Sequence, residues 1–111
     1  MNNFEFEKTN NIIEKLKSKI EYLSYKEEDM ELKYLSIISL LDAMLYYSEF
    51  LLFYPKAHNF VFNEIFNFFE KNNDLLVELY NEIINIKKQK QNLKRKFKKS
   101  TNILFYYENS K

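Results

Sequence analysis

Apolar residues recur at spacings of three and four along most of the chain, which is the pattern of amphipathic helices. Towards the amino end, Glu and Lys separate the members of the first such stripe, which are Ile13, Leu16, Ile20 and Leu23. This stripe predicts a helix over residues 5–23. Ser24 and Glu27 follow with the spacing of a capping box, in which two side chains satisfy free amides at a helix start. We therefore expect a second helix to begin at residue 25.

The expected second helix, residues 25–53, contains the most apolar part of the chain, residues 35–54. It should end before Pro55, because a residue that precedes proline is pushed out of helical geometry. The apolar stretch has the length of a membrane span, but Asp42 and Glu49 lie on one of its faces. Each carboxylate costs about 2.5 kcal/mol or more at the centre of a bilayer. We expect a core helix rather than a span, and no membrane partner.

Two more helices are expected after the proline. Residues 57–71 carry an apolar face made of Phe62, Ile65, Phe66 and Phe69. The Asn-Asn-Asp sequence at residues 72–74 is typical of a helix end followed by a new helix start. Over residues 74–99 one stripe alternates spacings of three and four without error, through Leu76, Leu79, Ile83, Ile86, Lys90, Leu93 and Phe97. Only Lys90 interrupts it, so we expect a long helix with one buried seam.

These elements predict an all-α fold, a small antiparallel bundle of about four helices in one domain over residues 1–111. The expected helices are 5–23, 25–53, 57–71 and 74–99. The chain has no glycine, and this favours few long elements over many tight turns. Ser100, Thr101 and Asn102 indicate the end of the last helix. Ile103–Tyr107 is then a short apolar tail, to which the sequence assigns no secondary structure. We favour a tail that packs back onto the bundle over a free docking peptide.

The formal net charge of +1 hides a sharp division along the chain. Residues 1–86 carry 8 Lys/Arg against 15 Asp/Glu, whereas residues 87–111 carry 9 against 1. Eight cations and no acid fall within the basic helix end, residues 87–99: Lys87, Lys88, Lys90, Lys94, Arg95, Lys96, Lys98 and Lys99. Two interpretations are open: a solvated lysine face, partly paired with the acidic body, or a surface that binds an anion. Among anions, an RNA or DNA backbone is favoured over a membrane or a purely protein target.

Chemistry other than binding finds little support in the residues present. There is no cysteine, no glycine and one histidine, which excludes disulfides, thiolate metal sites and glycine loops that cradle phosphates. His58, which follows Pro55, is expected to be a solvated loop residue. We therefore expect no enzyme activity, no metal site and no cofactor. The lack of cysteine fits a reducing compartment, so we expect a cytoplasmic protein.

The two signs of charge suit a target that itself combines a basic groove with nucleic acid, such as a ribonucleoprotein. The abundance of Asn, Lys, Ile, Phe and Tyr indicates an AT-rich genome. The sequence therefore favours a non-enzymatic binding protein that acts on a protein or ribonucleoprotein target. We expect a phage or mobile-element inhibitor of a nucleic-acid-handling protein, similar in role to anti-CRISPR proteins.

Two other classes of function remain open at this point. In a homo-oligomeric structural or adaptor protein, the seam from Leu76 to Phe97 would pair between chains, for instance in a homodimer. In a membrane-associated, immunity-like helical bundle, Lys94–Lys99 would lie near anionic lipid, with Phe105, Tyr106 and Tyr107 at the interface.

Overall fold

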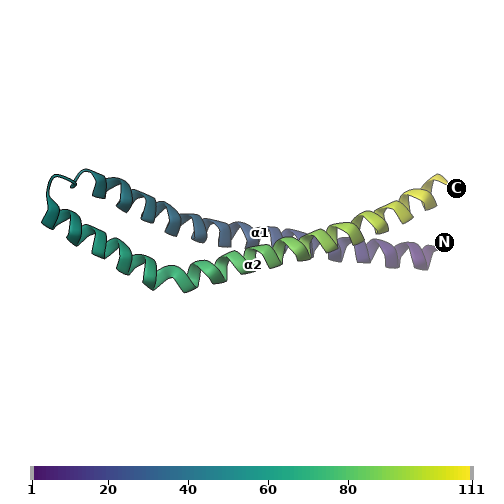
Figure 1. Cartoon of the computed structure of the whole chain (residues 1–111). Coiled ribbons are helices and arrows are strands. Elements are labelled where there is room, and N and C mark those ends of the chain that lie inside the picture. Colours follow the sequence, from purple (N-terminus) through teal and green to yellow (C-terminus); the bar gives the residue numbers. More distant parts are fainter. Residues whose placement is uncertain (1, 111) are drawn as a thin grey trace. The chain divides into compact units, whose positions relative to one another are not determined.

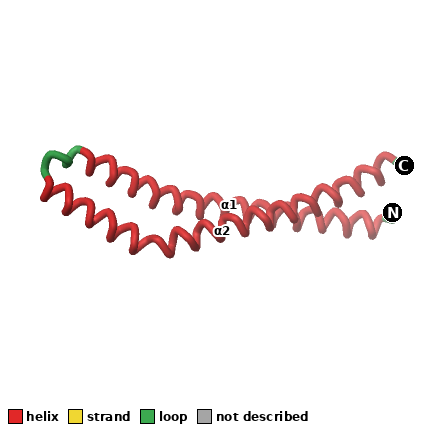
Figure 2. The backbone as a smooth tube through the Cα atoms, in the orientation of Figure 1, coloured by secondary structure: helices red, strands yellow, loops and turns green. Residues whose placement is uncertain are grey.

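The computed structural model describes residues 2–110 and contains two long helices (Figure 1). Helix α1 spans Asn3–Glu49, 47 residues, and helix α2 spans Pro55–Asn109, 55 residues. Residues 50–54 form the turn between them, drawn in green in Figure 2. No strand occurs within residues 2–110. The expected all-α class is therefore confirmed.

The prediction of four helices is wrong, because two helices take the place of four. α1 continues through Ser24, where a helix break was expected. Its inward positions alternate spacings of three and four without interruption, and every one is buried or half-buried: Phe6, Thr9, Ile13, Leu16, Ile20, Leu23, Glu27, Met30, Tyr34, Ile37, Leu41, Met44 and Ser48. A break at Ser24 would separate Leu23 from Glu27 on this seam. Continuous packing of the seam outweighs a local capping signal.

α2 likewise continues through both of its expected polar breaks. The side-chain amide of Asn72 donates to the carbonyl of Phe68 at 2.8 Å, a bond one turn back inside the helix. The hydroxyl of Thr101 donates to the carbonyl of Phe97 at 3.0 Å in the same way. These short polar side chains therefore bond to the helix instead of ending it. The supposed tail, Ile103–Tyr107, is part of α2.

The ends of the helices follow ordinary capping rules. The amide of Glu5 donates to Oδ1 of Asn2 at 2.8 Å, so Asn2 caps the start of α1. Pro55 is the first residue of α2, where its missing N–H removes no helical hydrogen bond. A break between helices was correctly expected before Pro55, but α1 ends at Glu49, four residues earlier than predicted.

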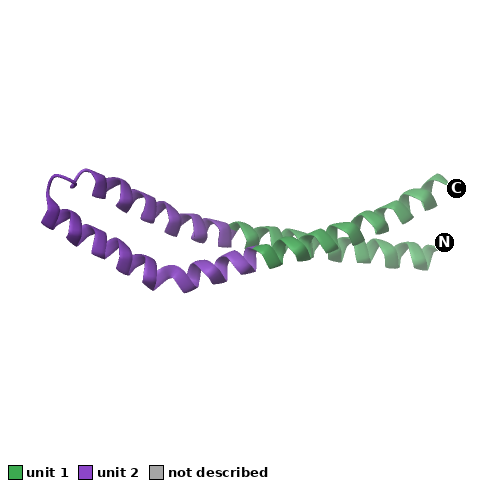
Figure 3. Ribbon diagram, viewed as in Figure 1, with its two compact units in different colours: residues 1–28, 84–111 green, residues 29–83 purple. Residues whose placement is uncertain are grey.

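The chain divides into two compact units (Figure 3). Unit 2, residues 29–83, is a helical hairpin made from the end of α1, the turn and the start of α2. Unit 1, residues 1–28 and 84–111, pairs the start of α1 with the end of α2. Within it the rings of Phe6 and Tyr107 lie 5.6 Å apart, so the apolar end of α2 packs against α1. The assignment of residues 1–111 to a single domain stays a prediction.

The apolar core of each unit is a single row of side chains along the helix seam. In unit 2 the buried apolar residues are Leu41, Ile65, Leu76, Leu79 and Ile83, and in unit 1 they are Ile13 and Ile86. No large side chain among the described residues is less than 2% exposed. Two helices can cover one face of each other and no more, so the remaining faces stay open to solvent.

Candidate polyanion-binding site

The basic segment, residues 87–99, is helical throughout and lies in unit 1. Its seam residues Lys90, Leu93 and Phe97 are half-buried, and the other cationic side chains are exposed. Six of these make no ion pair with any residue in the described range 2–110, and we call them the six unpaired cations: Lys88, Lys94, Arg95, Lys96, Lys98 and Lys99. The expected segment is thus a rigid surface whose positive charge is largely not neutralised by the chain itself.

Lys90 differs from its neighbours because it turns inward along the seam. Its Nζ lies 2.8 Å from Oε2 of Glu27 on α1, and only 17% and 14% of the two side chains are exposed. The bond is both an ion pair and a hydrogen bond, which is the stronger class of polar contact. Glu27 therefore occupies the ammonium group of Lys90, and we leave this residue out of the anion site that we propose.

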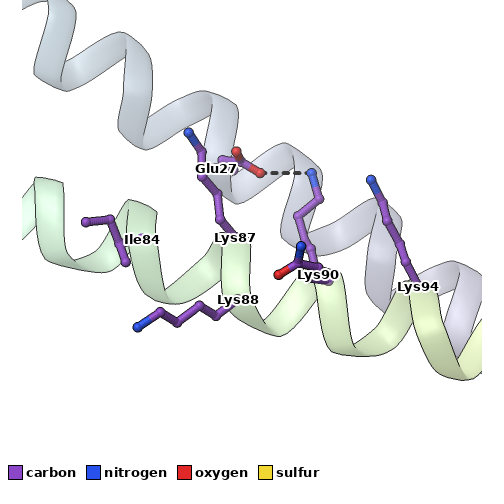
Figure 4. A pocket seen from close by; sticks show the side chains of 7 residues that line it. Glu27, Ile84, Lys87, Lys88, Lys90 and Lys94 are labelled. Atoms are coloured by element: carbon purple, nitrogen blue, oxygen red, sulfur yellow. Dashed lines mark hydrogen bonds and ion pairs between the residues drawn. The ribbon is translucent and has the colours of Figure 1, made fainter.

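A hollow of about 410 Å³ surrounds this ion pair. Four lysines and one glutamate line it, together with Ile84 and Gln91. In Figure 4 the side chains of Lys87, Lys90 and Lys94 rise towards α1 on both sides of Glu27, while Lys88 points away. Because four lysines and a single carboxylate line the hollow, its lining carries an excess of positive charge.

On the opposite flank of the basic segment lie residues of α1 that the sequence analysis did not identify as part of a site. Lys19, Tyr22 and Leu23 of α1 line a hollow of about 480 Å³ with Gln89, Asn92 and Leu93 of α2. Tyr22 is 65% exposed, so its ring is open to a flat ligand. The antiparallel register of the two helices could have predicted that α1 and α2 share this hollow. Once Glu27 is placed beside Lys90, residues near Leu23 must lie beside residues near Leu93.

The spacing of the six unpaired cations matches a charged rod better than a point ligand. Lys94 and Lys98 are one helical turn apart, as are Arg95 and Lys99, so each pair shares a face. Residues 88–99 extend over about 16 Å of helix axis. Duplex nucleic acid carries one phosphate charge for about every 1.7 Å of its axis, so several cations can meet phosphates at once.

Other ligand chemistry finds no comparable arrangement in the described part of the chain. Among residues 2–110 no group of three or more His, Asp or Glu side chains is placed to hold a metal ion. His58 was expected in a solvated loop, but it lies half-buried in the first turn of α2, with its ring stacked 6.1 Å from that of Phe62. Its position is explained by packing within unit 2.

No helix within residues 2–110 is both long enough and apolar enough to cross a membrane. No protein-family model, curated protein or solved structure matches the chain.

Proposed function

We propose that this chain is a non-enzymatic binding protein that holds the phosphate backbone of a nucleic acid on the outer side of α2. The observation that carries the proposal is the set of six unpaired cations on one rigid helix. An ordinary lysine-rich surface intersperses acids among its cations, whereas residues 87–99 contain none. A dense, unneutralised field of one sign attracts a polyanion.

The proposed mode of binding is electrostatic and independent of base sequence. Lysine and arginine contacts to phosphates release counterions, so affinity falls as salt rises. The side chains suited to reading bases are few, and Gln89 and Asn92 face the hollow beside Tyr22 rather than forming a row. Tyr22 offers one ring on which an unpaired base can stack, which favours single strands over a duplex.

A sharper version of this function is inhibition of a nucleic-acid-handling ribonucleoprotein. Unit 1 has a net charge of +7, from 14 Lys/Arg and 7 Asp/Glu, and unit 2 has −6, from 3 and 9. Such a chain can offer cations to RNA and acids to the basic groove of a protein. With an RNA-guided nuclease as the target, the loaded complex should bind more tightly than its RNA alone. Equal affinities, with unchanged nuclease activity, would remove the inhibitor role and keep simple nucleic-acid binding.

The decisive experiment changes the six unpaired cations to Gln together and measures binding to single- and double-stranded RNA and DNA across salt. Gln has nearly the helix propensity of Lys and Arg, so α2 should keep its structure. If five of the cations contact phosphates, log K should fall with log salt at a slope of about −3.5 on a single strand and about −4.5 on a duplex in the unchanged protein. The variant should lose at least about 100-fold in affinity at low salt, together with most of this slope.

A matched control removes the same charge elsewhere. Six exposed lysines outside the basic segment are changed to Gln: Lys8, Lys15, Lys17, Lys26, Lys56 and Lys71. If the proposal is right, this control keeps most of the affinity, although its net charge equals that of the variant. Equal losses in both proteins would show a nonspecific effect of net charge and would contradict a site on α2.

A further inference from the structure

Unit 2 leaves an unusual amount of apolar surface uncovered. On α1, Leu41 is buried at 8% exposure, but its neighbours Leu40, Leu45 and Tyr46 are 47%, 44% and 59% exposed. This part of α1 is apolar on several faces, and helices of that kind are normally buried on all sides. α2 covers only one of those faces, so the composition of α1 calls for a further covering surface.

One of the uncovered faces is hollowed between the two helices of unit 2. A groove of about 330 Å³ has Ile38 and Leu45 of α1 on one side and Phe62, Phe66 and Phe69 of α2 on the other. The three phenylalanines are 51%, 54% and 45% exposed. Asp42 is the one charged residue that lines the groove, and it is exposed. Large apolar grooves with little polar lining are typical of interaction sites.

The accessible surface of the chain is large enough for a stable dimer. It measures 9011 Å² for a mass of 13.7 kDa. A compact monomeric protein of this mass exposes about 6,600 Å², so the excess is about 2,400 Å². A stable dimer interface needs about 800 Å² from each partner. This excess belongs to both units together, and unit 2 carries 17 of the 24 exposed large apolar residues in the described part of the chain, so the uncovered apolar surface is concentrated on the unit that holds the groove.

We propose that the groove face of unit 2 binds the same face of a second copy of this chain, so that two hairpins form a four-helix bundle. A twofold axis lets the phenylalanine stripe of each copy fill the groove of the other, as an isologous interface requires. The bundle would then be made between chains instead of within one chain. The seam from Leu76 to Ile86 is already buried within the chain, so it is not the surface that pairs.

Charge gives the proposed dimer a distinctive salt dependence. Each unit 2 carries −6, so two of them repel, and screening by salt should strengthen the dimer or leave it unchanged. An acidic unit 2 bound to the basic unit 1 of another copy would show the opposite trend. A dimer that dissociates as salt rises would therefore overturn the assignment of the face.

The test is the mass in solution, measured by sedimentation equilibrium without nucleic acid. We expect about 27 kDa, twice the 13.7 kDa of one chain, and a melting temperature that rises with protein concentration. Phe62→Asp combined with Phe66→Asp should give a monomer, because it places charges in the interface. The control, Phe105→Asp with Tyr106→Asp, changes two exposed aromatic residues of α2 in unit 1 and should leave the dimer intact.

A milder variant keeps the test valid if the charged variant does not fold. Phe66→Ala removes one ring from each copy and should weaken dimerisation at least about tenfold with unchanged helix content at high concentration. A monomeric unchanged protein at about 100 µM would overturn the proposal. So would a dimer that survives Phe62→Asp combined with Phe66→Asp, whatever the changes at Phe105 and Tyr106 do.

Discussion

Units 1 and 2 use the same architecture, two antiparallel helices, to present opposite surfaces. Unit 1 is basic at +7 and carries the exposed cations of residues 87–99. Unit 2 is acidic at −6 and carries most of the exposed large apolar residues in the described part of the chain. Because the seam buries few residues, most positions of each unit face solvent, and the two units differ in the residues at those positions. The two units thus present a cationic surface and an acidic surface with exposed apolar side chains, and the two proposals give each surface a different partner.

The largest single-site effects should come from the buried side of each seam. Ile13→Ala in unit 1 and Leu41→Ala in unit 2 each remove a buried side chain, and each should lower the free energy of unfolding by about 2–4 kcal/mol. The controls are their exposed neighbours, Ile12→Ala and Leu40→Ala, at 43% and 47% exposure. Chemical denaturation should show smaller losses for both controls. A larger loss for Ile12→Ala than for Ile13→Ala would contradict the register of unit 1.

The polar contacts of the two units should differ by a smaller amount. Lys90 and Glu27 pair across the seam of unit 1 with little exposure, whereas Lys33 and Asp29 pair one turn apart at 3.0 Å, with 63% and 60% of their side chains exposed. Lys90→Gln should lower the free energy of unfolding by about 1–3 kcal/mol, because it leaves a half-buried carboxylate without its cation. Lys33→Gln should change it by less than about 0.5 kcal/mol.

The same variant also separates stability from binding. Since Glu27 occupies Lys90, Lys90→Gln should keep the salt slope of nucleic-acid binding, measured below its melting temperature. A double-mutant cycle with Glu27→Gln should show that the two losses are not additive. Additive losses would mean that the ion pair contributes nothing to the pairing of the helices in unit 1.

Helix content could be predicted from the sequence, but helix boundaries could not. The 3/4 spacing of apolar residues gave helices nearly everywhere that they occur. Ser24, Asn72 and Thr101 suggested breaks because short polar residues favour helix ends, yet Asn72 and Thr101 bond back to carbonyls inside α2. Within residues 2–110 the chain leaves helical geometry at residues 50–54, directly before Pro55, whose ring disfavours helical geometry in the residue that precedes it.

Each helix continues through its polar residues because they pack or pair with the other helix. The sequence of one segment alone does not show that contact. In α1 the seam includes Glu27. The sequence predicts a capping role for this residue, but in the structure its carboxylate pairs with Lys90 of α2. In α2 the inward positions Phe68, Asn72 and Leu76 are spaced four and four, which shifts the stripe by one residue and resembles an interruption. Local patterns do not distinguish such a shift from a new helix.

The candidate site could be predicted in part. Composition alone identified residues 87–99, because eight cations without an acid stand out in any register. Two other features depend on which residues of α1 lie opposite α2. They are the ion pair of Lys90 and the position of Lys19 and Tyr22 beside the basic segment. That register requires the two helices to be continuous, so the error in helix number also hid these contacts.

The smallest expected difference between the units lies in how their helices start. In unit 1, Asn2 caps α1 by accepting a hydrogen bond from the amide of Glu5, whereas α2 starts in unit 2 at Pro55. Asn2→Ala should cost about 1 kcal/mol and speed amide hydrogen exchange in the first turn of α1. Asn3→Ala is the matched control, because Asn3 is the first residue of α1 and does not cap it. Equal exchange rates in the two variants would mean that the cap at Asn2 does not hold the end of unit 1. In that case the packing of Phe6 against Tyr107 would be what keeps the start of α1 in place.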